Sequence, residues 1–277
     1  MTPGRAPPNK TTMTKHRVAD YLDAVRRDKG AGYLVLVDPD ALNEAATKHL
    51  AESARDAGID AFLVGGSLLI SDRLDATVRT LRDVSGVPTI LFPGAANQLS
   101  RHADAILFLS LLSGRNPDFL IGEQVRAAPI IRQYGLEPIP TAYLLIEGGT
   151  YTSVQFMSGT FPIPRTKVDI VVAHALAASY LGMRVVYLEG GSGANWPVPD
   201  EMIAAVREYV DLPIIVGGGI TTPDAAHAKV AAGASFIVTG NVLESDERPD
   251  LMREFAEAIH DAGNGGTVSP ACTPHVP

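Results

Sequence analysis

Hydrophobic and polar residues follow one another in blocks along this chain. Eight short runs are almost continuously apolar and rich in β-branched residues, at 33–40, 61–67, 89–94, 105–112, 137–149, 184–193, 212–220 and 235–241. Strands that are covered on both faces have this composition, as the strands of a parallel sheet do. The pattern therefore predicts eight buried parallel strands.

Most segments between these runs carry apolar residues at helical spacing, for example at 43–58 and 199–210. The gap between the third and fourth runs leaves room for little helix. Eight strand–helix units favour an α/β fold with one domain, a (β/α)8 TIM-like barrel at 17–263. The main alternative is a doubly wound sheet. That fold usually has a glycine fingerprint after its first strand, where this chain has LVDPD.

The two ends of the chain lack the block pattern. Residues 1–16 and 264–277 are polar and rich in Pro or Gly, and we expect them to be disordered. The formal net charge of −8 argues against a general nucleic-acid binder. No apolar run reaches the ~18 residues of a membrane span. The single cysteine, Cys272, has no partner for an internal disulfide, so we expect a cytoplasmic protein.

Polar residues and glycines gather at the C-terminal ends of the predicted strands. In a barrel these ends meet at one face, where active sites are built. The loops after strands seven and eight commonly bind phosphate through backbone N–H groups, so VGGGI and VTGN predict a phosphate site. Ordinary glycine turns are the alternative.

Two carboxylates at this face, Glu189 and Asp38, suggest chemistry. Glu189, in YLEGGSG, could act as a general base toward a substrate hydroxyl or cap loop amides. Asp38 and Ser67 could supply oxygen ligands to Mg²⁺, although DPD also suits an Asx–Pro turn. We expect Asp40 to be a turn residue or helix cap. Ser192 suits hydrogen bonding to a ligand, because no histidine in the motif could activate it.

Eight ordered motifs closely resemble those of the geranylgeranylglyceryl phosphate synthase family, which includes bacterial heptaprenylglyceryl phosphate synthases. They are LVDPD, VGGS, GRNPDFLIGE, PIPTAYLL, PIPRTK, YLEGGSGA, IVGGGI and VTGN, and the resemblance runs from about residue 18 to 262. GRNPDFLIGE and YLEGGSGA are similar to the second group of the family. Its members are barrel enzymes that, with Mg²⁺, transfer a prenyl group from a prenyl diphosphate to the hydroxyl of sn-glycerol 1-phosphate.

The resemblance implies a role for each matching position. Glu189 would be the catalytic residue that orients or deprotonates the hydroxyl, and Asp38 and Ser67 would bind Mg²⁺ near the diphosphate. FLIG and TAYLLI are candidate walls of a prenyl groove, although core packing explains both segments equally well. The resemblance also favours a homodimer or larger assembly. The acceptor phosphate would be bound by Tyr187, Leu188, Glu189, Gly190, Gly191, Ser192, Gly193, Gly218, Gly219, Gly240 and Asn241.

Two positions depart from the family pattern. Ala41 replaces the lysine of the usual DPDK, and Gly190 replaces the alanine of the usual YLEAGSG. A relative of the family, the prenyltransferase of moenomycin biosynthesis, attaches farnesyl to 3-phosphoglycerate. The Ala-, Arg- and Asp-rich composition is similar to that of high-GC bacteria.

We therefore expect a prenyltransferase acting on a three-carbon phosphate, with 3-phosphoglycerate as acceptor in phosphoglycolipid antibiotic biosynthesis. Gly190 would make room for its carboxylate. The alternative acceptor is sn-glycerol 1-phosphate, in ether-lipid biosynthesis. More distant alternatives are a barrel isomerase or lyase and a non-catalytic phosphometabolite-binding barrel.

Overall fold

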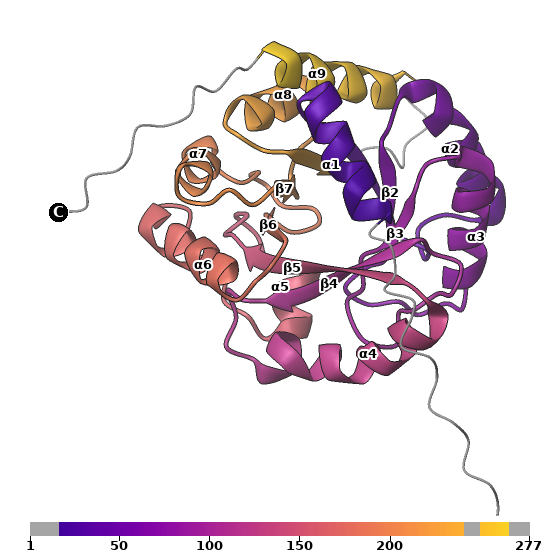
Figure 1. Cartoon of the computed structure of the whole chain (residues 1–277), viewed down its shortest axis with the longest axis horizontal. Helices are drawn as coiled ribbons and strands as arrows, with labels where there is room; N and C mark the ends of the chain where they lie inside the picture. Colours follow the sequence, from indigo (N-terminus) through magenta and orange to yellow (C-terminus); the bar gives the residue numbers. More distant parts are fainter. Residues whose placement is uncertain (1–16, 241–249, 266–277) are drawn as a thin grey trace, which may run out of the picture.

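A computed structural model describes residues 17–240 and 250–265. Eight strands form a closed barrel in chain order, and neighbouring strands pair in parallel (Figure 1). Each predicted run overlaps one strand, so the predicted (β/α)8 barrel is confirmed. The strands are β1 (Gly32–Val37), β2 (Ala61–Val64), β3 (Thr89–Leu91), β4 (Ala105–Leu111), β5 (Glu137–Leu145), β6 (Val185–Glu189), β7 (Ile214–Gly217) and β8 (Phe236–Thr239).

Helices form the outer layer. They are α1 (Arg17–Lys29), α2 (Glu44–Ala57), α3 (Leu74–Ser85), the π-helix η1 (Asp118–Gly122), α4 (Glu123–Tyr134), α5 (Ser153–Ser158), α6 (Val168–Tyr180), α7 (Asp200–Tyr209), α8 (Pro223–Ala231) and α9 (Leu251–Gly265). As the sequence predicted, residues 92–104 connect β3 to β4 without a helix. None of the helices in the described part of the chain is long and apolar enough to span a bilayer.

The helix boundaries follow from capping residues. Asn43 precedes α2 and accepts a hydrogen bond from the N–H of Ala46, and Gly58 ends the helix at φ 82°. Helix α9 continues to Gly265, two residues past the predicted end of the barrel. The predicted tail at 264–277 therefore begins inside α9, and residues 1–16 and 266–277 lie outside the described residues.

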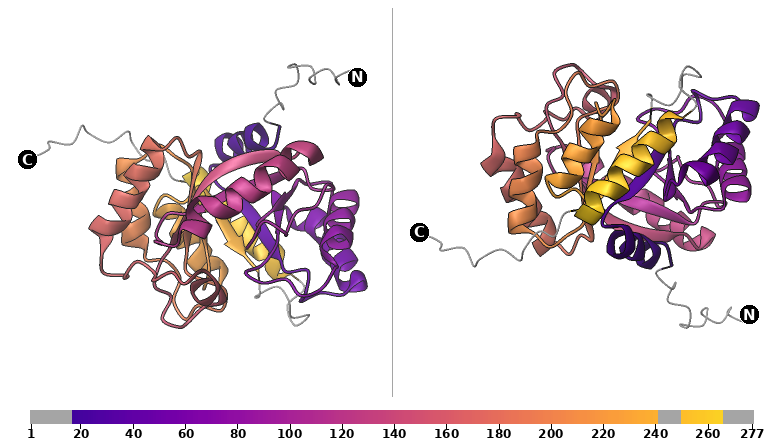
Figure 2. Two further views of the ribbon diagram at one scale, coloured as in Figure 1. Left: turned by 90° about the horizontal axis from the view of Figure 1, so that it is seen from below. Right: turned by 90° about the horizontal axis from the view of Figure 1, so that it is seen from above.

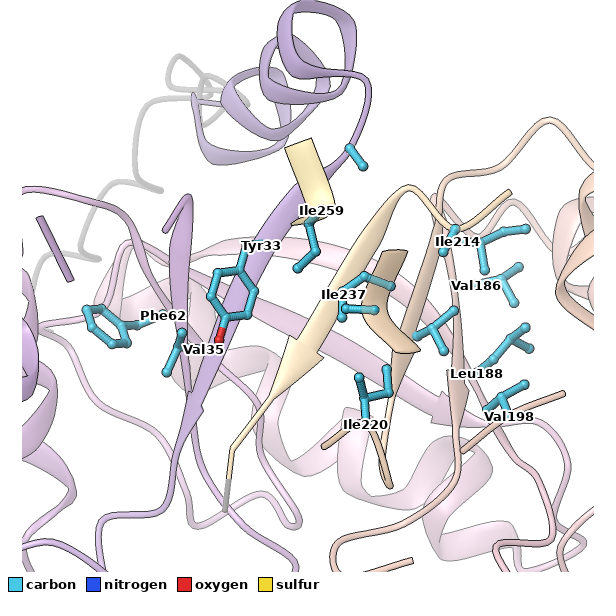
Figure 3. Close-up of a cluster of buried hydrophobic side chains, with 14 of the residues drawn as sticks. Tyr33, Val35, Phe62, Val186, Leu188, Val198, Ile214, Ile220, Ile237 and Ile259 are labelled. Carbon is cyan, nitrogen blue, oxygen red and sulfur yellow. The ribbon is translucent and has the colours of Figure 1, made fainter. Parts of the chain in front are cut away.

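The core has two layers, one inside the barrel and one between strands and helices. On β6, Tyr187 belongs to the inner layer with Leu34 and Ile215. Val186 and Leu188 belong to the outer layer, part of which Figure 3 shows. Both faces of the strand are buried, which explains its continuous apolar composition.

Helix α1 covers the amino-terminal end of the barrel (Figure 2). Glu137, the first residue of β5, accepts hydrogen bonds from the N–H groups of Val18 and Ala19 at 2.8 and 3.2 Å. These N–H groups have no partner within the helix, and a carboxylate also suits the positive end of the helix dipole. Val18 and Leu22 then pack into the inner layer.

Asp60 joins three elements at this same end. The carboxylate is fully buried and accepts hydrogen bonds from Lys29 Nζ at 2.6 Å, Tyr33 N–H at 2.8 Å and His260 Nε2 at 2.9 Å. Burial alone would raise the pKa of Asp60, but the hydrogen bonds from His260, Lys29 and Tyr33 hold it below its ordinary value. The ionised carboxylate therefore ties α1, β1 and α9 together.

Replacing Asp60 with Asn should destabilise the protein by roughly 2–4 kcal/mol at neutral pH, because a buried charge cluster loses its anion. Since the pKa of Asp60 is lowered in the fold, its contribution is complete above the unfolded-state pKa and disappears on acidification. Urea unfolding at neutral and acidic pH measures both effects. Asp83→Asn, at an exposed ion pair, is the control. Equal stability of the two variants would contradict this role.

Candidate active site

A cavity of about 440 Å³ opens at the carboxyl ends of the strands. It brings together residues that are far apart in the sequence, because consecutive parallel strands of a barrel end at one face. The predicted residues that line it are Asp38, Ser67, Tyr187, Glu189, Ser192, Gly193, Gly218, Gly219 and Gly240.

Glu189 ends β6 and is only 5% exposed. Its Oε1 accepts a hydrogen bond from the N–H of Gly191 at 2.5 Å. Burial raises the pKa of Glu189 to about 7, although the Gly191 hydrogen bond and the nearby Tyr187 hydroxyl act in the opposite direction. A carboxyl with this pKa can take up and release a proton near neutral pH, as a general base requires.

Three aromatic rings form the inner wall of the cavity beside Glu189. Phe92 stacks on Tyr187 with centroids 5.2 Å apart, and Tyr143 lies 5.4 Å from Tyr187 and 5.9 Å from Phe92. Burial and then the Glu189 charge raise the pKa of both tyrosines well above its ordinary value, so both stay neutral. The buried Tyr187 hydroxyl has no well-aligned hydrogen-bond partner in the described part of the chain. Its position beside Glu189 opposes the rise in the pKa of that carboxyl.

Gly218 and Gly219, after β7, line the cavity next to Glu189. Both have left-handed backbones, at φ 82° and 71°, and their N–H groups donate to no acceptor within the described residues. A Cβ at Gly218 would lie 2.4 Å from Glu189 Oε1 and 2.5 Å from the nitrogen of Gly191. Free N–H groups that a phosphate can approach closely are typical of barrel phosphate sites.

Asp38 and Ser67 lie on the far side of the cavity. Asp38 Oδ1 accepts a hydrogen bond from the Asp40 N–H at 2.8 Å, while Oδ2 faces Gly66, where a Cβ would lie 3.3 Å away. No group of three or more acidic, His or Cys side chains suited to a metal occurs in the described residues. One carboxylate oxygen and one hydroxyl fit Mg²⁺ if phosphate oxygens and water complete its shell.

Asp40 is a turn residue, as one of the two predictions had it, because the Ala41 N–H donates to the Asp38 carbonyl across it. It is not the cap of the following helix. Asn43 caps α2, and the Asp40 carboxylate instead accepts hydrogen bonds from the N–H groups of Ile70 and Ser71 at 2.7 and 3.1 Å. Arg73 donates to the carbonyls of Asp40 and Leu42, each at 3.0 Å, on both sides of Ala41. The loops that carry Asp38 and Ser67 are therefore clamped together.

A second cavity, of about 100 Å³ and mostly apolar, adjoins the first. It lies between α4 and the segment after β3, where no helix covers the barrel. Phe119 of FLIG and Tyr143 of TAYLLI line it, whereas the other residues of these two candidate segments do not. No pattern along the chain indicated the wall formed by residues 92–96. Five residues line both cavities: Gly66, Ser67, Phe92, Tyr143 and Val154.

Some predicted phosphate-site residues do not line the cavity. Leu188 points outward into the layer beneath the helices (Figure 3). A Cβ at Gly190 would point toward the carbonyls of Gly218 and Trp196, at 3.2 and 3.4 Å, so the missing methyl does not make room for an acceptor carboxylate. Gly191 contributes its N–H to Glu189 rather than lining the cavity. Asn241 lies outside the described residues.

Comparison with known proteins matches residues 23–259 to the PcrB family. Relatives named geranylgeranylglyceryl phosphate synthase include one from Thermococcus gammatolerans, 50% identical over 82% of this chain and 90% of its own length. Another, from Chitinophaga pinensis, is 44% identical over 86% of this chain and 94% of its own length. A crystal structure of (S)-3-O-geranylgeranylglyceryl phosphate synthase from Thermoplasma acidophilum, in complex with its substrate sn-glycerol-1-phosphate, superposes with a TM-score of 0.83. It is 36% identical and covers 90% of this chain and all of that chain.

Replacing Gly218 with Ala should weaken binding of inorganic phosphate by about tenfold or more, because its Cβ would strike Glu189 and the Gly191 nitrogen. Titration calorimetry measures the binding. Gly182→Ala is the matched control, since Gly182 has φ 77° but no atom lies within 4 Å of its Cβ position. If both variants bound phosphate equally well, Gly218 would have no place in a phosphate site.

Proposed function

The chain belongs to the PcrB family, and from this we propose that it transfers a prenyl group from a prenyl diphosphate to the free hydroxyl of sn-glycerol 1-phosphate. The earlier expectation of a prenyltransferase enzyme is confirmed by the relatives. One observation of the structure supports the proposed reaction most directly. A polar cavity with free N–H groups and a buried carboxylate meets an apolar cavity at shared residues.

The two cavities suit the two substrates. Free N–H groups at Gly218 and Gly219 would bind the acceptor phosphate, beside the lining residues Ser192 and Gly193. The apolar cavity would hold the prenyl chain, with its reactive carbon at the shared wall beside Phe92 and Tyr143. There the rings exclude water, and their faces stabilise positive charge that develops on that carbon.

Glu189 would act on the acceptor hydroxyl. As the hydroxyl oxygen forms a bond to the first carbon of the prenyl group, the bond from that carbon to the diphosphate oxygen breaks. The hydroxyl proton passes to the ionised Glu189 carboxylate, and diphosphate leaves. The raised pKa of Glu189 makes the carboxylate a stronger base than one in water.

Asp38 and Ser67 would hold a Mg²⁺ ion next to the diphosphate. When bound, the ion neutralises negative charge on the leaving group. The Asp40–Arg73 clamp keeps the two ligand loops in place. Dependence on Mg²⁺ and assembly as a homodimer stay predictions.

Two observations favour glycerol 1-phosphate over 3-phosphoglycerate as the acceptor: the names of the relatives and the position of Gly190. No relative described above is named for 3-phosphoglycerate, and Gly190 does not open space for a carboxylate. The alternative acceptor, glycerol 1-phosphate, is therefore preferred. Antibiotic biosynthesis has no support beyond the initial resemblance.

An assay with separate acceptors tests the proposal. The protein is incubated with Mg²⁺ and geranylgeranyl or farnesyl diphosphate, together with sn-glycerol 1-phosphate, sn-glycerol 3-phosphate or 3-phosphoglycerate. Mass spectrometry of the extracted lipid identifies the product. We expect a prenyl ether with sn-glycerol 1-phosphate and at least about tenfold less with the other acceptors.

Two other outcomes of this assay would contradict the proposal. Ether formed only with 3-phosphoglycerate would restore the antibiotic assignment and overturn the choice of acceptor. No ether with any acceptor, from protein that unfolds cooperatively on heating, would overturn the prenyltransferase proposal itself.

A further inference from the structure

Four large aromatic side chains project into solvent at the end of the barrel that holds the site. Tyr151, Phe156 and Phe161, between β5 and α6, are 79%, 80% and 85% exposed, and Trp196, between β6 and α7, is 51% exposed. We call these four residues the aromatic rim. Exposed rings gathered in this way usually mark a binding surface. Both connections follow strand ends, so they lie opposite α1 (Figure 2).

The two connections of the rim are joined. The N–H of Trp196 donates to the carbonyl of Gly148 at 3.1 Å, and the Asn195 side chain donates to the carbonyl of Gly149 at 3.0 Å. The Trp196 ring packs where a Cβ of Gly149 would lie, 2.5 Å from that position. Trp196 is thus held against the start of the connection that carries the other three rings.

The rim continues into the apolar cavity. On α5, Val154 and Met157 line that cavity, while the neighbouring Phe156 faces solvent. Met157 lines the cavity and is also 43% exposed to solvent. One short helix therefore connects the apolar interior with the exposed rings.

Positive charge accompanies the rings. The stretch 147–167 contains Arg165, Lys167 and one acid, Glu147, so its net charge is +1 in a chain of net charge −8. Arg165 lies 5.3 Å from the Trp196 ring centroid and donates to the carbonyl of Pro197. Neither Arg165 nor Lys167 forms an ion pair with a described residue. Exposed rings flanked by unpaired cations are complementary to a bilayer, which has phosphates above an apolar layer.

We propose that the aromatic rim docks the protein on a phospholipid bilayer surface, with the rings in the headgroup region and Arg165 and Lys167 near lipid phosphates. This inference rests on the proposed function, because an enzyme with a prenyl substrate has a use for contact with a bilayer. A prenyl chain could pass between the bilayer and the apolar cavity along α5 without crossing water. Docking itself requires no substrate.

Vesicle sedimentation without substrates tests the docking. The full chain is mixed with vesicles of phosphatidylcholine that contain a minority of phosphatidylglycerol. Phe156→Ser combined with Phe161→Ser should lower the partition coefficient by about tenfold or more. Tyr180→Ser combined with Leu181→Ser is the matched control, because these residues are 83% and 67% exposed at the end of α6, the opposite end of the barrel.

Turnover of a water-soluble short-chain prenyl diphosphate without vesicles should be the same in all three proteins, and matching thermal unfolding checks their fold. The proposal is overturned if the wild type stays in the supernatant, or if the control loses binding as much as the rim variant. It is also overturned if light scattering shows a wild-type dimer that the rim variant loses, since a second copy would then cover the rim. Vesicle binding without any prenyl transfer would leave docking intact and contradict the proposed function alone.

Discussion

The candidate site depends on one constraint, the burial of the Glu189 carboxylate at the end of a barrel strand. The difference between its ordinary pKa of 4.5 and about 7 corresponds to roughly 3 kcal/mol of folding free energy. Because the pKa is raised in the fold, this loss of stability develops as the pH rises from 4.5 and is complete above 7. Neighbours are small to accommodate the carboxylate, since a Cβ at Gly217 or Gly218 would lie 3.2 or 2.4 Å from its oxygens. Strongly shifted carboxyl groups in cavities are common where proton transfer occurs.

Barrel topology places this carboxylate between two environments. Helix α1 covers the amino-terminal end, so ligands have to enter at the carboxyl ends of the strands. There the polar cavity faces glycine N–H groups, and the segment after β3, which has no helix, leaves an apolar cavity beside it. Phe92 and Tyr143 belong to both, which is where an apolar chain and a polar acceptor would meet. The aromatic rim extends the apolar path to the protein surface.

Much of the fold could be read from the sequence because buried parallel strands carry a strong apolar signal. The strand ends then placed Asp38, Glu189 and Gly218 at one face. The direction of each side chain was harder to predict. Leu188 is as apolar as its neighbours in the sequence, but in the strand its side chain points outward, into the layer beneath the helices. Asp40 shows another limit, because its partners Ile70 and Ser71 lie in a different loop and leave no local pattern. The aromatic rim was missed because exposure depends on packing, not on residue type.

The most direct test of the account is the pH dependence of kcat/KM for prenyl transfer in the wild type and in Glu189→Gln. We expect the wild-type value to rise about tenfold per pH unit and to level off near pH 7, where Glu189 is ionised. In Glu189→Gln the rate should fall by about two orders of magnitude, and this rise should be lost. Ionisation of the acceptor phosphate affects both proteins, so their difference isolates the carboxylate. Near-normal turnover in Glu189→Gln, with an unchanged pH profile, would contradict the account.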